Sequence, residues 1–314
     1  MRIGLHFILL LTSCSAAYSQ GCSDAGFCTM GAMKPDQPYN KKTPIKLRSM
    51  EFSFYRGTTT LTPIVYVATA DLNFSIKAKN SFQIKLPYQA VQGRLAGTGS
   101  AGDISLCFTR NIYTSDAFDL NISVGGKIPT NQSDKSIDGR PLPMYYQTSL
   151  GTYDIISGIS LINRKWLFAT GIQIPLNQNH NQFVWSAWAG TEEEAYVNQY
   201  NQAKDLRRGI DVMFRAERNF RFSKFNLSLG LLPIYRVKKD EFTKSGKAAN
   251  SGEVRVSPDD SQGLALSGIC TLGYNFNVQS GVRLLAGHKI QQRSVNPDGL
   301  TREFVSSVTY FYRF

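Results

Sequence analysis

Apolar and polar residues alternate along most of this chain. In residues 70–77 three large apolar side chains alternate with polar ones, and residues 82–89 repeat the pattern after a short turn at Lys79-Asn80. Successive side chains of a β-strand point to opposite faces, so both segments read as strands with one apolar and one polar face. Their polar faces match, which predicts a β-hairpin.

The same period of two predicts about twelve strands. They cover residues 49–56, 70–77, 82–89, 103–113, 117–127, 153–162, 166–175, 209–220, 225–237, 263–276, 278–289 and 303–314. In residues 209–220, Asp211, Arg215 and Glu217 share one face. Unpaired charge in a dry interior costs several kcal/mol, so this face does not suit the core of a β-sandwich.

Short and long connections alternate between the predicted strands. Strands two and three, four and five, six and seven, eight and nine, and ten and eleven are joined by very short turns, whereas most other connections are long, such as residues 176–208. A bacterial outer-membrane barrel with both termini in the periplasm has this alternation, because its periplasmic turns are short and its outer loops are longer.

The last strand ends in an aromatic residue and carries a regular outer face. Its alternate residues are Val308, Tyr310, Tyr312 and Phe314. This ending resembles the terminal strand by which the outer-membrane assembly machinery recognises barrels. Together these patterns predict an all-β fold, an antiparallel transmembrane β-barrel of about twelve strands over residues 48–314, in a bacterial outer membrane.

Composition agrees with a membrane barrel and excludes other classes. Hydrophobic residues make up 42% and charged residues 18% of the chain, and the mean hydropathy is −0.22. Beyond the first twenty residues there is no apolar run of eighteen, which excludes a bundle of membrane helices. The formal net charge is +12, but the 35 Lys and Arg residues are scattered, so we do not expect nucleic-acid binding.

The first 19 residues have the pattern of a signal peptide. Arg2 precedes an apolar run over residues 3–11, and small residues follow, with cleavage expected after Ser19. A lipobox ending at Cys14, which would become an acylated terminus, is the alternative interpretation.

Export to an oxidising compartment would allow Cys22 and Cys28 to form a disulfide. Two thiols fall short of the four ligands of a structural zinc site, so no metal is expected. We expect Cys107 and Cys270, each within a predicted strand, to be free thiols. The segment over residues 20–47 could fold into the barrel as a plug or remain a periplasmic tether.

The sequence offers little material for catalysis. Of its three His residues, His6 lies in the signal, His180 in a predicted outer loop and His288 near the end of strand eleven. No nucleophile, metal-protease or nucleotide-binding motif is present. We therefore expect no enzymatic activity and no cofactor.

Two segments carry a family resemblance. SFQIKLPY (residues 81–88) and GDISLCFTRNI (residues 102–112) resemble outer-membrane transporters of the phenol meta-degradation pathway type, which are related to long-chain fatty-acid transporters. Gly97, Gly99, Gly102 and Asp103 approximate the glycine spacing of that group. The resemblance implies uptake of a small hydrophobic compound, whereas the NPA plug motif of the fatty-acid transporters is missing from this sequence.

Charged residues in the polar phase of the strands are candidates for the channel lumen. They are Asp71, Lys77, Lys85, Asp119, Asp211, Arg215, Glu217, Arg283 and Arg313. This mixed-sign set could shape a diffusion path or could fill a narrow lumen with salt bridges.

We expect a passive outer-membrane transporter or channel for a small hydrophobic solute, with outer-membrane lipid and the assembly machinery as its other partners. The alternative is a membrane anchor or scaffold whose outer loops or N-terminal segment bind a protein.

Overall fold

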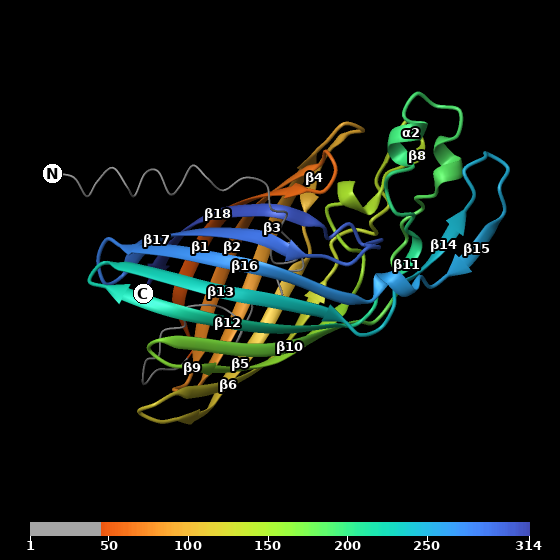
Figure 1. Ribbon diagram of the computed structural model, residues 1–314. Helices are drawn as coiled ribbons and strands as arrows, with labels where there is room; N and C mark the ends of the chain where they lie inside the picture. Colours follow the sequence, from red (N-terminus) through yellow and green to blue (C-terminus); the bar gives the residue numbers. More distant parts are fainter. Residues whose placement is uncertain (1–44) are drawn as a thin grey trace, which may run out of the picture.

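The computed structural model describes residues 45–314, and their main body is one antiparallel sheet that closes on itself (Figure 1). β1 (Lys46–Thr59) pairs with β2 (Ile64–Ile76) on one side and with β18 (Arg302–Arg313) on the other. The remaining barrel strands are β3 (Asn80–Gln92), β5 (Ile104–Thr114), β6 (Asp119–Ile128), β9 (Asp154–Ile162), β10 (Trp166–Pro175), β12 (Asp211–Phe222), β13 (Phe225–Arg236), β16 (Gly263–Asn275) and β17 (Ser280–Gln291).

The predicted barrel of about twelve strands is confirmed. The sheet counts 13 strands because it also includes β4 (Gly97–Ala101), which pairs only with the outer end of β3 and is not part of the closed barrel. No helix in the described part of the chain is long and apolar enough to cross a membrane.

The two faces of each strand follow the sequence pattern. In β12, Asp211, Met213, Arg215 and Glu217 are buried, whereas Phe214 between them is 45% exposed. The same alternation runs through β18, where Val308 is 50% and Tyr310 44% exposed. The barrel thus has an apolar outer surface and a largely polar interior, as expected for a membrane barrel.

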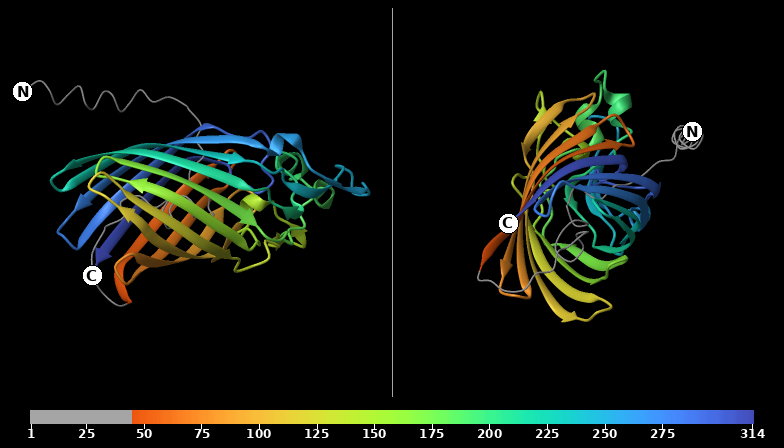
Figure 2. Two further views of the ribbon diagram at one scale, coloured as in Figure 1. Left: turned by 90° about the horizontal axis from the view of Figure 1, so that it is seen from below. Right: turned by 90° about the vertical axis from the view of Figure 1, so that its left-hand side faces the viewer.

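The two ends of the barrel differ in their connections (Figures 1 and 2). One end carries the short turns and the C-terminus, and the other carries the long loops. By the convention for membrane barrels we call these the periplasmic and the outer end. β1 and β2 extend beyond the segments predicted from the sequence, so only residues 60–63 connect them at the outer end.

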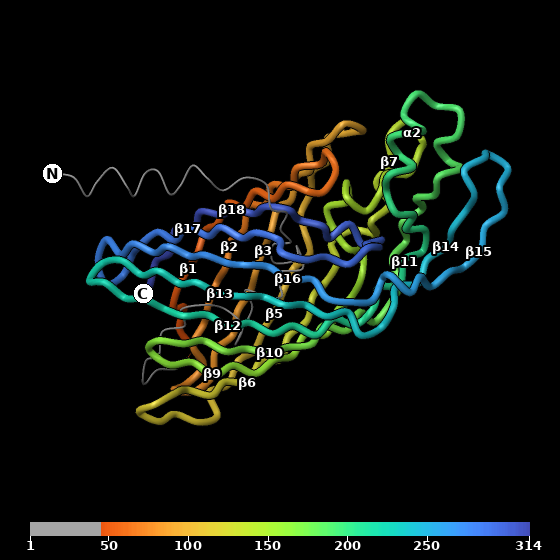
Figure 3. Tube along the Cα trace, viewed as in Figure 1, coloured from red at the N-terminus to blue at the C-terminus, as the bar shows by residue number. Residues whose placement is uncertain are grey.

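The outer loops contain their own short elements and fold over the end of the barrel (Figure 3). These elements are β7 (Ser136–Ile137), β8 (Arg140–Pro141), η3 (Met144–Tyr146), η4 (Trp185–Trp188), α2 (Glu194–Val197), β11 (Lys204–Arg207), β14 (Glu241–Ser245), β15 (Glu253–Val256) and η5 (Asp259–Ser261). One buried cluster, which includes Tyr146, Trp188 and Tyr196, joins η3, η4 and α2. A second, which includes Met144, Leu206 and Phe242, joins η3, β11 and β14, and we call this folded layer the cap.

Several expectations fall on residues outside the described range. They are the signal peptide over residues 1–19, the alternative lipidation of Cys14, the disulfide between Cys22 and Cys28, and nearly all of the segment over residues 20–47. β1 begins at Lys46, so the last two residues of that segment belong to the barrel wall.

Candidate functional site: the barrel interior and its cap

The structure places most of the predicted lumen residues on the inner face. Asp71, Asp211, Arg215 and Glu217 are buried there. Lys85, Asp119, Arg283 and Arg313 occupy the same phase of their strands and are half-buried. Lys77 is exposed in the turn after Ile76, the last residue of β2, so it lies at the periplasmic rim.

Inner-face charges pair with one another. The Nε of Arg215 donates to Oε1 of Glu217 at 2.7 Å, and both side chains are almost fully buried. Nη1 of Arg283 lies 3.5 Å from Oε2 of Glu51 on the neighbouring part of the wall. Asp71 accepts a hydrogen bond of 2.7 Å from Gln83. These pairs fit the interpretation in which salt bridges fill part of the lumen.

An apolar belt runs obliquely over the inner face of one side of the barrel, across β5, β9, β10, β12, β13 and β16. It consists of Cys107, Ile156, Leu167, Ala169, Met213, Leu232 and Ile269, all on the inner phase of their strands. Ile162, Ile234 and Leu285 pack against it. The inward charges predicted from the sequence do not indicate this belt, and the sequence signal for it is Met213, which stands in phase with Asp211 and Arg215.

Polar side chains line the interior toward the periplasmic ends of β5 and β6. Asn111 donates to Asn121 at 3.2 Å, and the hydroxyls of Thr109 and Ser123 lie 2.8 Å apart. A solute crossing the barrel would therefore pass between a polar wall and the apolar belt.

A buried network of charges lies at the outer end of the interior. Its members are Asp154, Arg208, Asp211, Arg236, Asp240, Arg293 and Asp298, and we call it the outer ion network. Arg236 lies at its centre. Its guanidinium donates to Asp211 at 2.7 and 2.8 Å, to Asp240 at 2.6 and 2.7 Å, and to Asp298 at 2.8 Å.

The network ties three outer loops to the barrel wall. Asp154, Asp211 and Arg236 belong to β9, β12 and β13. The loop residue Arg208 lies 3.0 Å from Asp154, and the loop residue Arg293 lies 3.6 Å from both Asp240 and Asp298. Separation of these loops from the wall would leave several buried charges without partners, so the network holds the cap in place.

Four carboxylates face three guanidinium groups in the network. The pKa values of its two loop carboxylates, Asp240 and Asp298, shift in opposite directions. Burial raises the pKa of Asp240, and Asp298 adds to this, while Arg236 opposes it. Burial alone would also raise the pKa of Asp298, but Arg236, Arg293 and Arg208 together hold it below its usual range. Asp298 is therefore the well-compensated carboxylate, and Asp240 is the one closer to taking up a proton.

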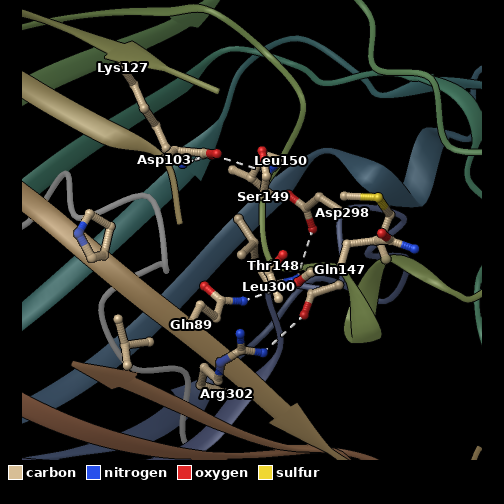
Figure 4. A pocket seen from close by; sticks show the side chains of 14 residues that line it. Gln89, Asp103, Lys127, Gln147, Thr148, Ser149, Leu150, Asp298, Leu300 and Arg302 are labelled. Carbon is tan, nitrogen blue, oxygen red and sulfur yellow. Dashed lines mark hydrogen bonds and ion pairs between the residues drawn. The ribbon is translucent and has the colours of Figure 1, made fainter. Parts of the chain in front are cut away.

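A small cavity of about 30 Å³ lies under the cap (Figure 4). It is lined by Gln89 of β3 and Lys127 of β6, by Asp103 just before β5, and by residues of the inward-folded loops over 129–153 and 292–301. Lys127 lies 2.9 Å from Asp103, which also accepts the backbone N–H of Leu150 at 3.0 Å. A cavity of this size holds about one water molecule, so the two loops close tightly around it.

The loop over residues 292–301 requires a glycine at position 299. Gly299 has a φ of +69 degrees, in the left-handed region that favours glycine. A Cβ atom at Gly299 would lie 2.7 Å from the backbone nitrogen of Tyr145 in the other loop. Both the backbone conformation and the close contact therefore demand glycine here.

Three tyrosines are hydrogen-bonded to one another within the cap. The hydroxyls of Tyr196 and Tyr200 lie 2.5 Å apart, and that of Tyr200 lies 3.4 Å from Tyr146. Burial, with the hydrogen bond from Tyr196, raises the pKa of Tyr146 to about 12. Tyr146 thus remains neutral across the physiological range.

The histidines stand apart from these features. His180 is exposed in an outer loop, and His288 lies half-buried on β17 in the phase of the lipid-facing Leu284. Within residues 45–314, no group of three or more His, Cys, Asp and Glu side chains could hold a metal ion.

Comparisons with known proteins identify the fold. No protein-family model and no curated protein sequence matches the chain. The chain is similar to the COG4313 outer membrane channel from Pseudomonas putida F1, with a TM-score of 0.60 and 12% identity over 89% of this chain and 99% of that chain. The NanC porin has a TM-score of 0.47 and 7% identity over 85% of this chain and 100% of that chain. The Ralstonia pickettii toluene transporter TbuX has a TM-score of 0.43 and 10% identity over 86% of this chain and 90% of that chain. The first similarity shows that the chain has the fold of an outer-membrane barrel.

Proposed function

We propose that this protein is an outer-membrane channel or transporter that lets a small hydrophobic molecule cross by passive diffusion. The apolar belt is the observation that carries the proposal. Water-filled barrels have polar interiors, whereas one side of this interior carries a continuous patch of Ile, Leu, Met, Ala and Cys side chains. Such a patch offers no ligands to a hydrated ion and offers van der Waals contact to an apolar solute.

The similarity to an outer-membrane channel supports this proposal at the level of fold. A solute entering from outside would have to pass the cap, so the loops held by the outer ion network would act as the gate.

Dye entry into living cells tests the transport role. Intact outer membranes exclude the hydrophobic dye N-phenyl-1-naphthylamine, so its fluorescence reports entry. We expect cells carrying the protein to admit the dye faster than cells with an empty vector. The double variant Met213→Gln, Leu232→Asn should slow entry severalfold because polar side chains then occupy the belt.

The matched control is Thr109→Ser, which changes an inward side chain outside the belt. It should retain the rate of the unaltered protein, and all variants should show the gel-mobility shift on heating that reports a folded barrel. Entry at the empty-vector rate, or belt variants as fast as the unaltered protein, would refute the proposal.

Export and assembly form part of the same proposal. A signal peptide over residues 1–19 would deliver the chain to the periplasm, and the assembly machinery would recognise Val308, Tyr310, Tyr312 and Phe314. These residues lie on the lipid-facing side of β18 and just after it, where Phe314 is 64% exposed. An edge strand with such a face is accessible before the barrel closes.

A second candidate is a membrane anchor that presents a protein-binding surface. It is favoured by one observation: β11, β14 and β15 form a separate three-stranded sheet outside the barrel. Deletion of residues 246–252 at the tip of the β14–β15 hairpin should leave dye entry unchanged if the protein is a transporter. An anchor would instead show no dye entry at all and would lose its partner on deletion.

A further inference from the structure

Charge is distributed unequally between the two ends of the barrel. The five periplasmic turns, residues 77–79, 115–118, 163–165, 223–224 and 276–279, contain five Lys or Arg and one Asp. The outer segments, residues 60–63, 93–103, 129–153, 176–210, 237–262 and 292–301, contain 12 Lys or Arg and 13 Asp or Glu. The positive charge is therefore uncompensated at the periplasmic rim and balanced at the outer end.

Part of this charge gathers on one side of the rim. β10 pairs with β12, so the turn after β9 and the turn after β12 are neighbours. Arg164, Lys165 and Lys224 are exposed on these turns, and the backbone N–H of Asn219 donates to the carbonyl of Lys165 at 2.7 Å. With Arg218, they form what we call the basic cluster.

Arg218 is held on the lipid-facing wall by aromatic rings. It lies opposite Trp166 across the β10–β12 pair, and its guanidinium carbon is 4.8 Å from the Trp166 ring centroid and 5.8 Å from that of Phe220. Trp166 in turn stacks on Phe168 with centroids 5.5 Å apart. Aromatic side chains of this kind mark the level of the lipid headgroups, so Arg218 is fixed where headgroup phosphates lie.

Acidic side chains do not neutralise the cluster. Glu217 points into the barrel and pairs with Arg215, and Asp116 lies on the turn between β5 and β6. Among the described residues, no ion pair involves Arg164, Lys165, Arg218 or Lys224. The four cations therefore face the membrane surface together.

We propose that the basic cluster binds the headgroup of an anionic phospholipid, with phosphatidylglycerol as the test ligand, in the leaflet at the periplasmic end. The planar guanidinium of Arg218 can donate two hydrogen bonds to phosphate oxygens, and the turn cations add attraction from the aqueous side. The acyl chains would then lie along the apolar wall formed by β10 and β12. This binding goes beyond transport and does not depend on it.

Quenching of Trp166 fluorescence tests the proposal in lipid vesicles. The full-length protein is inserted into phosphatidylethanolamine vesicles that contain acyl-brominated phosphatidylglycerol or acyl-brominated phosphatidylethanolamine. Bromine quenches only on contact, and Trp185 and Trp188 lie in the outer loops beyond the acyl chains, so the quenched fraction reports Trp166. We expect half-maximal quenching at about a fivefold lower mole fraction of brominated phosphatidylglycerol than of brominated phosphatidylethanolamine. This factor corresponds to the attraction of about one basic residue to an anionic surface.

Two charge-matched variants separate a site from a general attraction. Arg164→Gln, Lys165→Gln, Lys224→Gln should bring the two lipids to equal quenching. The same number of charges removed at exposed outer positions, by Lys238→Gln, Lys244→Gln, Lys247→Gln, should leave the preference intact. Equal quenching by both lipids in the unaltered protein, or equal losses in the two variants, would overturn the proposal.

Discussion

Replacement of Arg236 by glutamine should greatly weaken the attachment of the cap. The Arg236 guanidinium makes five hydrogen bonds to Asp211, Asp240 and Asp298, and its side chain is 1% exposed. Glutamine keeps part of the side-chain volume but removes the charge. Four buried carboxylates would then face only two guanidinium groups, those of Arg208 and Arg293.

The expected cost at neutral pH is about 3–5 kcal/mol of unfolding free energy, the usual effect of removing one partner from a buried ionic group. The cost should shrink on acidification. Arg236 lowers the pKa of both Asp240 and Asp298 in the folded protein, so without it both pKa values rise. A carboxyl group whose pKa is higher in the folded than in the unfolded protein stabilises the folded state increasingly as pH falls through the folded pKa. The difference in unfolding free energy between the variant and the unaltered protein should therefore narrow as pH is lowered from about 7 to about 5.

Urea unfolding of the vesicle-inserted protein, followed by tryptophan fluorescence, measures both effects. The double variant Arg236→Gln, Asp240→Asn should recover part of the loss because it restores an excess of one negative charge. The exposed Lys238→Gln is the control and should change the unfolding free energy by less than about 0.5 kcal/mol. A loss below about 1 kcal/mol for Arg236→Gln at pH 7.5, or a loss independent of pH, would show that the network does not hold the cap as we argue.

Three further predictions concern single positions. Asp298→Asn should lower the urea midpoint at pH 7.5 more than Asp240→Asn, because the folded protein lowers the pKa of Asp298 and raises that of Asp240; equal shifts would contradict this. Tyr200→Phe should lower the unfolding free energy by about 1 kcal/mol and speed proteolytic cleavage of the cap, because the buried hydroxyls of Tyr146 and Tyr196 each lose a partner. An unchanged cleavage rate would show that the tyrosine cluster does not stabilise the cap. Intact mass spectrometry of the exported protein should give a chain starting after residue 19 and two hydrogens lighter than its reduced form, with Cys22→Ser abolishing that difference; a mass carrying acyl chains would favour the lipobox alternative.

Sequence periodicity determined the wall of the barrel. Along β12, the side-chain period of two places Asp211 and Arg215 inside and Phe214 outside, and the structure has them there. This works because a membrane barrel has one lipid-facing and one interior face throughout, so each strand shows its orientation locally. The period is less informative at strand ends, which is why Lys77 lies in a turn although its phase suggested the lumen.

The tertiary structure alone decided what fills and covers the barrel. Asp154, Arg236 and Asp298 are far apart in sequence, and only barrel closure and loop folding bring them into one network. The apolar belt likewise joins single residues from many strands, each unremarkable within its own segment. Local patterns record which way a side chain points, whereas the partners it meets across the interior depend on the register of all the strands and on loops that have no period to read.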